Sequence, residues 1–458
     1  MRNPSLVSTV LALAASACPC AGAGPRDYLS KPDEWFQSAE GRRIVDNVVS
    51  WQSSAGSWPK NMDTTERRFS GRRGEISGTF DNGATVGELR LLARAYRAAR
   101  HEPYRDAFRK GVVHILEAQY PTGGWPQFHP PSRFYHRHIT FNDDTVVNLL
   151  ELMRWVATSA EDDLVGARGR RAARRAFERG IDCILKCQIV VNGRKTVWCA
   201  QHDAETLEPR QGRSYELVSL SGGESVGVLL LLMSIDDPSP AVVDAIVAGA
   251  GWYESSEITD EADLRAIGVE KPGWARFYEI PTNRPIFSGR DGVKKFSIME
   301  IERERREGYA WWGRWGDRVA REYSKWTRRH MDHPTVKALV EGEARFQAGK
   351  YAEAYQALIG LATAERRTEC SRLAAGMLRQ IAKIGADRLE EIKKQSRTDP
   401  QGAIEALEKM QTDFRGFRVA QEAARLLAKL KDAQGQEPAG NGSKEGSLRD
   451  AERLGTAV

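Results

Sequence analysis

QSSAGSWP at residues 52–59 and QYPTGGWP at residues 119–126 are two copies of one short pattern, and this pattern decides the fold. In both copies a glutamine is followed at the same intervals by a glycine, a tryptophan and a proline. A third, degraded copy runs from Gln188 through Gly193 to Trp198. The copies begin 67 and then 69 residues apart, which is longer than the roughly 34 to 47 residues of a helix-pair solenoid repeat.

Each copy of the pattern stands between two apolar helical stretches. IVDNVVSWQ, GVVHILEAQ and GIDCILKCQ precede the loops, and long apolar helices are expected after residues 80, 141 and 220. Three units of two helices and a long loop favour hairpins that close around an axis over hairpins that stack in a line. We therefore predict an all-α fold, an (α/α)3 toroid, whose three helix starts gather at one mouth.

The three predicted helix starts carry acidic residues. FDNGAT contains Asp81, FNDDTV contains Asp143 and Asp144, and LSGGES contains Ser221 and Glu224, at places that the repeat makes equivalent. One interpretation is helix capping, which contributes about 1 kcal/mol for each helix. The other is a cation site, because the helix dipole keeps a carboxylate at an N-terminus ionised. Carboxylates without His or Cys favour Ca²⁺ over a transition metal.

A polar loop at residues 196–222 leads into the third helix start and is too long for an idle connection in a compact domain. It carries Arg210 and Arg213, and Arg284 and Arg290 follow in NRPIFSGRDG. A guanidinium fork matches a carboxylate in shape and charge. Arginines beside a bound cation would therefore make a site for a ligand with several carboxylates.

The two ends of the chain differ from its middle in composition. Residues 1–23 contain a basic residue, a short apolar run and small residues, which predicts a signal peptide and a secreted or periplasmic protein. A lipoprotein modified at Cys18 is the alternative. Residues 433–458 contain few apolar residues and are expected to be a disordered tail.

Two domains are expected between these ends. Residues 25–330 would form the toroid, with a small β-hairpin or extended appendix around residues 270–295. Residues 335–432 would form a second helical domain, in which RFQAGKYAEAYQAL resembles the turn of a tetratricopeptide repeat. This domain would either dock a protein partner or pack as accessory helices on the toroid.

The formal net charge of +6 favours an acidic partner. Because no basic motif is interleaved with stacking aromatics, we expect no nucleic-acid binding. The apolar runs are too short to predict a membrane span.

Several segments together resemble the polysaccharide lyase family 10 pectate lyases. They are WPKNMD, GTFDNGAT, HITFNDD, TVWCAQHDAETLEPR with YELVSLSGGESVG, and PIFSGRDG, which spread over roughly residues 40–318 and leave out the C-terminal helices. The resemblance implies an (α/α)3 toroid, polygalacturonate (pectate) as substrate and Ca²⁺-dependent β-elimination as the reaction.

The resemblance also implies roles for particular residues. Asp81 and Asp143 match the acids that hold Ca²⁺, with Asp144 as a close neighbour, and Arg213 matches the arginine that acts as Brønsted base. Arg290 looks like the arginine that binds the uronate carboxylate, and Arg284 is near enough to be its alternative. The substrate-binding candidates are Lys60, Arg210, Arg284 and Arg290.

An arginine base has an unusual requirement, because its ordinary pKa exceeds about 12. Arg213 would have to become neutral at least transiently, which burial and neighbouring positive charge would favour. His138 and His202 are alternative bases, although a lone histidine is more often structural.

Two other functions fit parts of the pattern. The repeat resembles the glutamine–tryptophan motif of terpenoid cyclases, and Asp143 with Asp144 resembles their protonating acid. Those enzymes need an aromatic-lined cavity, whereas the loop at 196–222 is polar. A noncatalytic uronan-binding protein is the other alternative.

Overall fold

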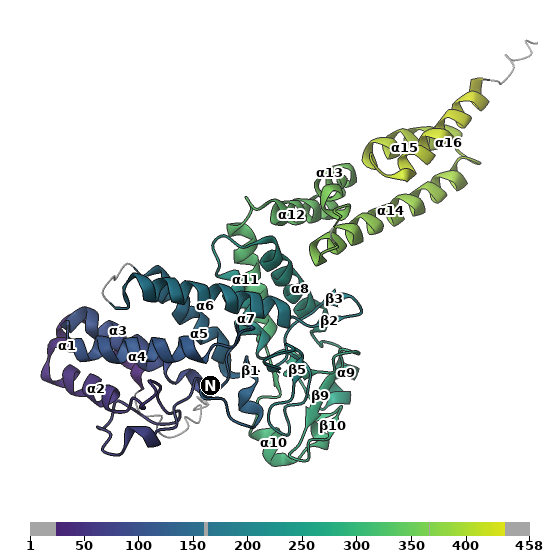
Figure 1. Cartoon of the computed structure of the whole chain (residues 1–458). Coiled ribbons are helices and arrows are strands. Elements are labelled where there is room, and N and C mark those ends of the chain that lie inside the picture. Colours follow the sequence, from purple (N-terminus) through teal and green to yellow (C-terminus); the bar gives the residue numbers. More distant parts are fainter. Residues whose placement is uncertain (1–23, 160–163, 366, 436–458) are drawn as a thin grey trace, which may run out of the picture. The chain divides into compact units, whose positions relative to one another are not determined.

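The computed structural model describes residues 24–159, 164–365 and 367–435, and the chain divides into one compact unit that ends at Arg329 and another that begins at His330 (Figure 1). The predicted signal peptide and residues 436–458 of the predicted tail lie outside the described residues. Within the described part, no helix combines the length and apolar character needed to cross a membrane.

Three helical hairpins repeat along the first unit, as predicted. The outer helices α2, α4, α6 and α8 are neighbours in sequence order, and so are the inner helices α3, α5 and α7, with α11 beside α7. This is the arrangement of the predicted α/α toroid. The bounds are α1 (Asp33–Gln37), α2 (Ala39–Ser50), α3 (Val86–Ala99), α4 (Glu102–Ala118), α5 (Thr145–Thr158), α6 (Gly166–Cys187), α7 (Ser225–Met233), α8 (Pro240–Ser256), α9 (Glu261–Ile267), α10 (Arg303–Glu307) and α11 (Trp315–Arg329).

The glutamine of the repeated pattern joins each hairpin to the next one. In every copy its Nε2 donates to a carbonyl oxygen of its own loop and to an alanine carbonyl oxygen in the following outer helix. The second bond runs from Gln52 to Ala107 at 2.8 Å, from Gln119 to Ala176 at 2.8 Å and from Gln188 to Ala245 at 3.0 Å. The pattern is therefore a structural staple between repeats.

The tryptophan and glycine of the pattern have equally local reasons. Each tryptophan is fully buried and donates from Nε1 to a carbonyl oxygen of the preceding outer helix. Gly56 and Gly123 have φ of 111° and 101°, and a Cβ on either would collide with a carbonyl oxygen of the next outer helix. Only glycine fits this conformation and this close approach.

Each inner helix also packs closely on the outer helix that follows it. A glycine on the outer helix faces a leucine on the inner helix, and a Cβ on the glycine would lie 2.3 to 2.7 Å from that leucine. The pairs are Gly111 with Leu89, Gly180 with Leu150, and Gly249 with Leu229. The same contact thus sets the helix spacing in all three repeats.

Short strands line the loops at one end of the hairpins and form the expected appendix. The sheets have the orders β1-β4-β5, β10-β9-β8-β6, β11-β7 and β2-β3, and every pair is antiparallel. The bounds are β1 (Ile139–Thr140), β2 (Val190–Val191), β3 (Arg194–Lys195), β4 (Gln201–His202), β5 (Pro209–Arg210), β6 (Leu220–Ser221), β7 (Trp274–Ala275), β8 (Phe277–Tyr278), β9 (Pro285–Ser288), β10 (Lys294–Lys295) and β11 (Trp312–Gly313).

The second unit is helical and has its own core, which includes Ile381, Leu407 and Phe414. The predicted turn falls between α12 and α13, where Gly349 has φ of 70°. The last helix ends at Gly435, close to the expected start of the tail. The bounds are α12 (Pro334–Gln347), α13 (Tyr351–Ala362), α14 (Glu369–Gln395), α15 (Pro400–Asp413) and α16 (Arg418–Gly435).

Candidate active site

Two short 3₁₀ turns carry the candidate acids into the inner helices. η3 (Asp81–Gly83) precedes α3, η5 (Asn142–Asp144) precedes α5, and the two turns are in contact. Asn82 at φ 54° and Asp143 at φ 51° both occupy the left-handed region. When the two turns are aligned on these left-handed residues, Asn82 corresponds to Asp143 and Asp81 corresponds to Asn142. The expected equivalence of Asp81 and Asp143 is therefore wrong by one residue. Each turn still contributes one acid to the mouth.

The carboxylates of Asp81 and Asp143 act on each other. Asp81 is buried, forms an ion pair with Nζ of Lys60 and accepts the N–H of Asn82 at 3.2 Å. Asp143 accepts Nδ2 of Asn142 at 2.6 Å. Partial desolvation, and after it the negative charge of Asp81, raise the pKa of Asp143. A cation placed between the two carboxylates would relieve this repulsion.

The third repeat contributes an acid that is already neutralised. Glu224 accepts the hydroxyl of Ser221 and forms an ion pair with Arg276, and the two charged side chains are 2% and 14% exposed. Nη2 of Arg276 also lies 3.4 Å from Oδ1 of Asn142, and its guanidinium lies 4.5 Å from the ring centre of Tyr309. Sequence reasoning missed Arg276, although a charge inside the apolar run WARFY was a usable signal.

Arg213 lies at the same mouth and is paired with Glu216. Its Nε and Nη2 donate to Oε1 of Glu216 at 2.9 and 2.5 Å, and its backbone N–H donates to Oε2 at 2.9 Å. The rings of Tyr215 and Tyr309 lie 5.3 and 5.7 Å from the guanidinium carbon. Desolvation alone would lower the pKa of Arg213, but the hydrogen bonds and charge of Glu216 raise it above its ordinary value. Burial acts in the expected direction, but the carboxylate of Glu216 outweighs it.

A loop at residues 129–138 carries two titratable side chains that the charges of both Asp81 and Arg213 influence. Burial and the positive charge of Lys60 lower the pKa of His136, and the charges of Asp81 and Arg213 also act on it. Burial raises the pKa of Tyr135, while the charge of Arg213 opposes that shift. Tyr135 and His136 thus lie within electrostatic range of both Asp81 and Arg213.

Arg290 follows β9 and is connected to Arg213 through other side chains. It is 61% exposed and binds Glu304, with Nη2 2.8 Å from Oε1. Glu304 also binds Arg305, whose guanidinium lies 4.9 Å from the ring centre of Tyr215. Arg290 therefore lies at the rim of the mouth, and it is linked to Arg213 through Glu304, Arg305 and the ring of Tyr215.

Arg284 precedes β9 and so lies at the other end of the strand from Arg290. Its guanidinium lies 4.0 Å from the ring centre of Phe296, and no contact given for the described residues joins it to Asp81 or Arg213. Of the two arginines that the sequence left open, Arg290 has the connection to the mouth.

The other sequence candidates lie in or directly before the strands of the β1-β4-β5 sheet. Arg210 binds Asp203, with Nε 3.1 Å from Oδ2. His202 is fully buried, its Nε2 accepts the N–H of Cys199 at 3.1 Å, and burial lowers its pKa to about 4. Burial also lowers the pKa of His138. These bonds give His202 a structural role.

Asp81 and Asp143 are the acids best placed to hold a cation. The carboxylate of Asp144 lies against α7, where a Cβ on Gly227 would fall 1.9 Å from Oδ1. Among the residues described, no three or more His, Cys, Asp or Glu side chains form a group that could hold a metal. Two carboxylates and the amide of Asn142 are hard oxygen donors that suit Ca²⁺, and water or substrate would complete its roughly six to eight positions.

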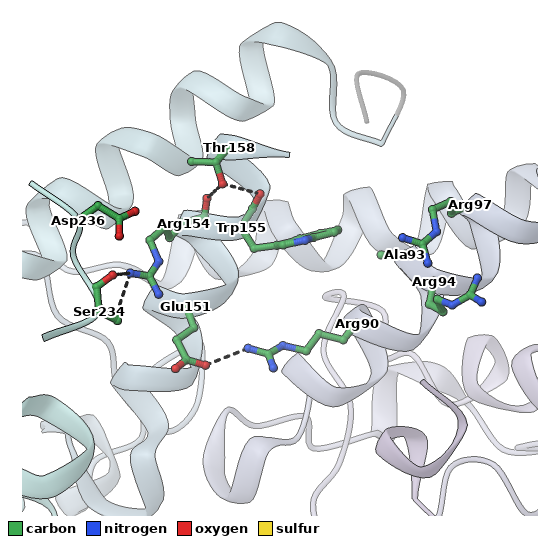
Figure 2. A pocket seen from close by; sticks show the side chains of 10 residues that line it. All are labelled: Arg90, Ala93, Arg94, Arg97, Glu151, Arg154, Trp155, Thr158, Ser234 and Asp236. Carbon is green, nitrogen blue, oxygen red and sulfur yellow. Dashed lines mark hydrogen bonds and ion pairs between the residues drawn. The ribbon is translucent and has the colours of Figure 1, made fainter. Parts of the chain in front are cut away.

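A cavity of about 810 Å³ lies towards the C-terminal ends of the inner helices (Figure 2). The acids, in contrast, precede the N-terminal ends of these helices. Its arginines connect neighbouring helices: Arg90 binds Glu151 at 3.1 Å and Arg154 donates to Oγ of Ser234 at 2.8 Å. Trp155 adds an exposed ring. These bonds cross-link α3, α5 and the end of α7.

The chain is similar to known lyases. The sequence model of the family described as pectic acid lyase matches residues 52–320. The structure is similar to the family 10 polysaccharide lyase from Cellvibrio cellulosa and to a mutant of that enzyme in complex with trigalacturonic acid. Both have 37% sequence identity and a TM-score of 0.57, and the similarity covers 64% of this chain and 94% and 95% of those chains. No curated protein matches this chain.

The helical toroid, with its mouth of carboxylates and arginines, is that of a polysaccharide lyase. The family match spans more than half of the residues, so the chain belongs to the pectic acid lyase family. The match includes all three hairpin loops and ends before α12. Family membership confirms the resemblance seen in the sequence and sets aside the terpenoid-cyclase alternative.

Proposed function

We propose that this protein cleaves polygalacturonate by Ca²⁺-dependent β-elimination, with Arg213 as the base. The observation that carries the proposal is a series of contacts at one mouth. The turns of Asp81 and Asp143 are in contact, Arg276 reaches Asn142 of the second turn, and the ring of Tyr309 lies beside both Arg276 and Arg213. The complex of a related lyase with trigalacturonic acid supports an acidic uronan as substrate.

The elimination needs a base and a way to neutralise the uronate carboxylate. The base removes the C5 hydrogen, the electrons of that bond form the C4–C5 double bond, and the O4 glycosidic oxygen leaves and takes up a proton. Ca²⁺ held by Asp81 and Asp143 would neutralise negative charge that develops on the carboxylate. Arg290, at the rim, would bind the uronate carboxylate in exchange for Glu304, whereas Arg276 is already paired with Glu224.

The pair with Glu216 decides how Arg213 can act. Because Nε and Nη2 both donate to Glu216, the guanidinium has a fixed direction, and Nη1 makes no hydrogen bond within the described residues. Nη1 is therefore the atom left for the substrate. Since Glu216 opposes proton loss, the neutral guanidine is a small fraction that grows as pH rises.

One assay separates this function from noncatalytic uronan binding. Incubation with polygalacturonate and Ca²⁺ should produce ultraviolet absorbance from the conjugated 4,5-unsaturated product, and excess chelator should stop it. Binding of polygalacturonate without new absorbance, over a range of pH that includes alkaline values, would make the protein a uronan-binding module instead.

We also propose that the protein is secreted or periplasmic, because its substrate is a polysaccharide outside the cell, and that residues 335–432 form a docking module. Cell fractionation tests the first statement. Loss of a co-purifying protein on deletion of residues 335–432 tests the second.

A further inference from the structure

A second cavity, of about 310 Å³, adjoins the mouth on the side of Lys60. Its wall consists of the 3₁₀ helix η1 (Pro25–Tyr28), the loop that carries Lys60, and the first turn of α3. η1 precedes the part of the chain that the family model matches, which begins at residue 52. η1 is thus an addition to the matched region, and it closes a cavity whose other walls lie within that region, next to the candidate acids.

Arg26 brings a positive charge to this cavity. Its guanidinium lies against η3, the turn that carries Asp81, because a Cβ on Gly83 would fall 2.4 Å from Nη2 of Arg26. Within the described residues this guanidinium has no hydrogen bond and no ion pair, whereas the neighbouring Lys60 is paired with Asp81. Asp27 also borders the cavity, but its carboxylate accepts the backbone N–H of Gly24 at 2.9 Å.

Glu88 provides a buried polar atom in the same cavity. Its Oε1 accepts the hydroxyl of Thr64 at 3.2 Å, while Oε2 is buried and has no hydrogen-bond partner in the part of the chain that the structure describes. A buried carboxylate oxygen without a partner is costly and rare, so it calls for a polar ligand or water. Burial also raises the pKa of Glu88 to about 7, so near neutral pH the group can either accept or donate a hydrogen bond.

We propose that this cavity is a further substrate subsite, which binds one additional uronate residue of the polysaccharide. Arg26 forms an ion pair with the carboxylate of that uronate, and Glu88 forms a hydrogen bond with one of the hydroxyl groups of the same uronate. A volume of about 310 Å³ is at the small end of ligand sites, which suits one sugar ring. The inference rests on the proposed function, because the ligand is taken to be a neighbour of the residue that is cleaved.

The test is the dependence of kinetics on substrate length. Oligogalacturonates of increasing, defined length are cleaved by the full chain and by Arg26→Gln. We expect KM to rise about tenfold, the value of one charge-assisted bond, only for oligomers long enough to reach the cavity, with kcat unchanged. Arg26→Lys should recover part of the loss. Arg72→Gln is the matched control, since Arg72 is an exposed arginine that pairs with Glu75 and does not border the cavity.

Variants of Glu88 and a binding measurement complete the test. Glu88→Gln should retain the length dependence and Glu88→Ala should reduce it, with thermal unfolding recorded to identify any loss of fold. If Arg26→Gln changes KM equally for all lengths, or not at all, the subsite is wrong. If the wild-type chain cleaves no galacturonate, calorimetric affinity for trigalacturonate and longer oligomers decides instead, and an affinity unaffected by Arg26→Gln overturns the proposal.

Discussion

Replacing Arg213 with alanine should reduce both stability and turnover, and the structure allows the two effects to be separated. The carboxylate of Glu216, on a side chain that is 4% exposed, would lose two fork bonds but keep the backbone N–H of residue 213 and the hydroxyl of Tyr309 at 2.8 Å. Each charge-assisted bond contributes about 1.5–3 kcal/mol. Because Arg213 is 38% exposed, solvent screening reduces this, and we expect a loss of about 2 kcal/mol in the free energy of unfolding.

Turnover should fall further than the stability loss accounts for. Removing a positioned base typically lowers the rate by about 10² to 10⁴ fold, or roughly 3–5 kcal/mol of barrier. The informative variant is Arg213→Ala combined with Glu216→Gln, in which no buried charge is left unpaired. Its urea unfolding should return towards the wild-type midpoint while its rate of double-bond formation stays low. If turnover returns together with stability, Arg213 acts through the fold and is not the base.

Four further outcomes are expected. Glu216→Gln alone should shift the rate–pH profile to lower pH, because Glu216 raises the pKa of Arg213 and the deprotonated guanidine is the reactive form; an unmoved profile would count against a guanidine base. Excess chelator should abolish turnover, and Asp81→Asn and Asp143→Asn should each raise the Ca²⁺ concentration needed for half-maximal rate; full activity in chelator would contradict the cation site. Gly180→Ala should destabilise the toroid by about 1–3 kcal/mol through its clash with Leu150, whereas Gly251→Ala in α8, where a Cβ meets nothing within 4 Å, should be neutral or stabilising by up to about 1 kcal/mol, as urea unfolding would show. Residues 24–333 should fold and cleave polygalacturonate alone, and insolubility of that fragment would mean that the second unit covers apolar surface of the first.

The repeated hairpins could be predicted because their signals are local. Glutamine, glycine and tryptophan recur within a few residues of each other, and the apolar helices follow at fixed intervals. The glutamine bonds to the next outer helix and the tryptophan bonds to the preceding one explain why these residues recur, but the sequence pattern does not show these bonds. The offset between Asp81 and Asp143 escaped prediction because it depends on which residue of each turn is left-handed. Asn82 and Asp143 are residue types that tolerate this conformation, so a signal existed.

The charge pairs of the mouth were harder to foresee. Arg276 and Glu224 are 52 residues apart, and the antiparallel pairing of β8 with β6 brings them together. The partner of Arg213, in contrast, is three residues away in RSYE, a spacing that the sequence displays. The direction of the pKa shift of Arg213 depends on its hydrogen bonds with Glu216, which composition alone does not show.

The glutamine staples have a consequence for how the toroid grows and stops. Each junction joins the loop of one hairpin to the outer helix of its successor, so the three junctions are copies of a single head-to-tail interface. A head-to-tail interface generates a ring where its rotation closes and leaves an open end where the series stops before closure. Here α8 takes the last staple, and the chain then turns into the β-appendix and α11, which packs on α7 and α8. The segment that carries Arg276 and Arg290 is therefore also the piece that ends the series, so the rim of the candidate site and the number of repeats are specified by the same stretch of chain.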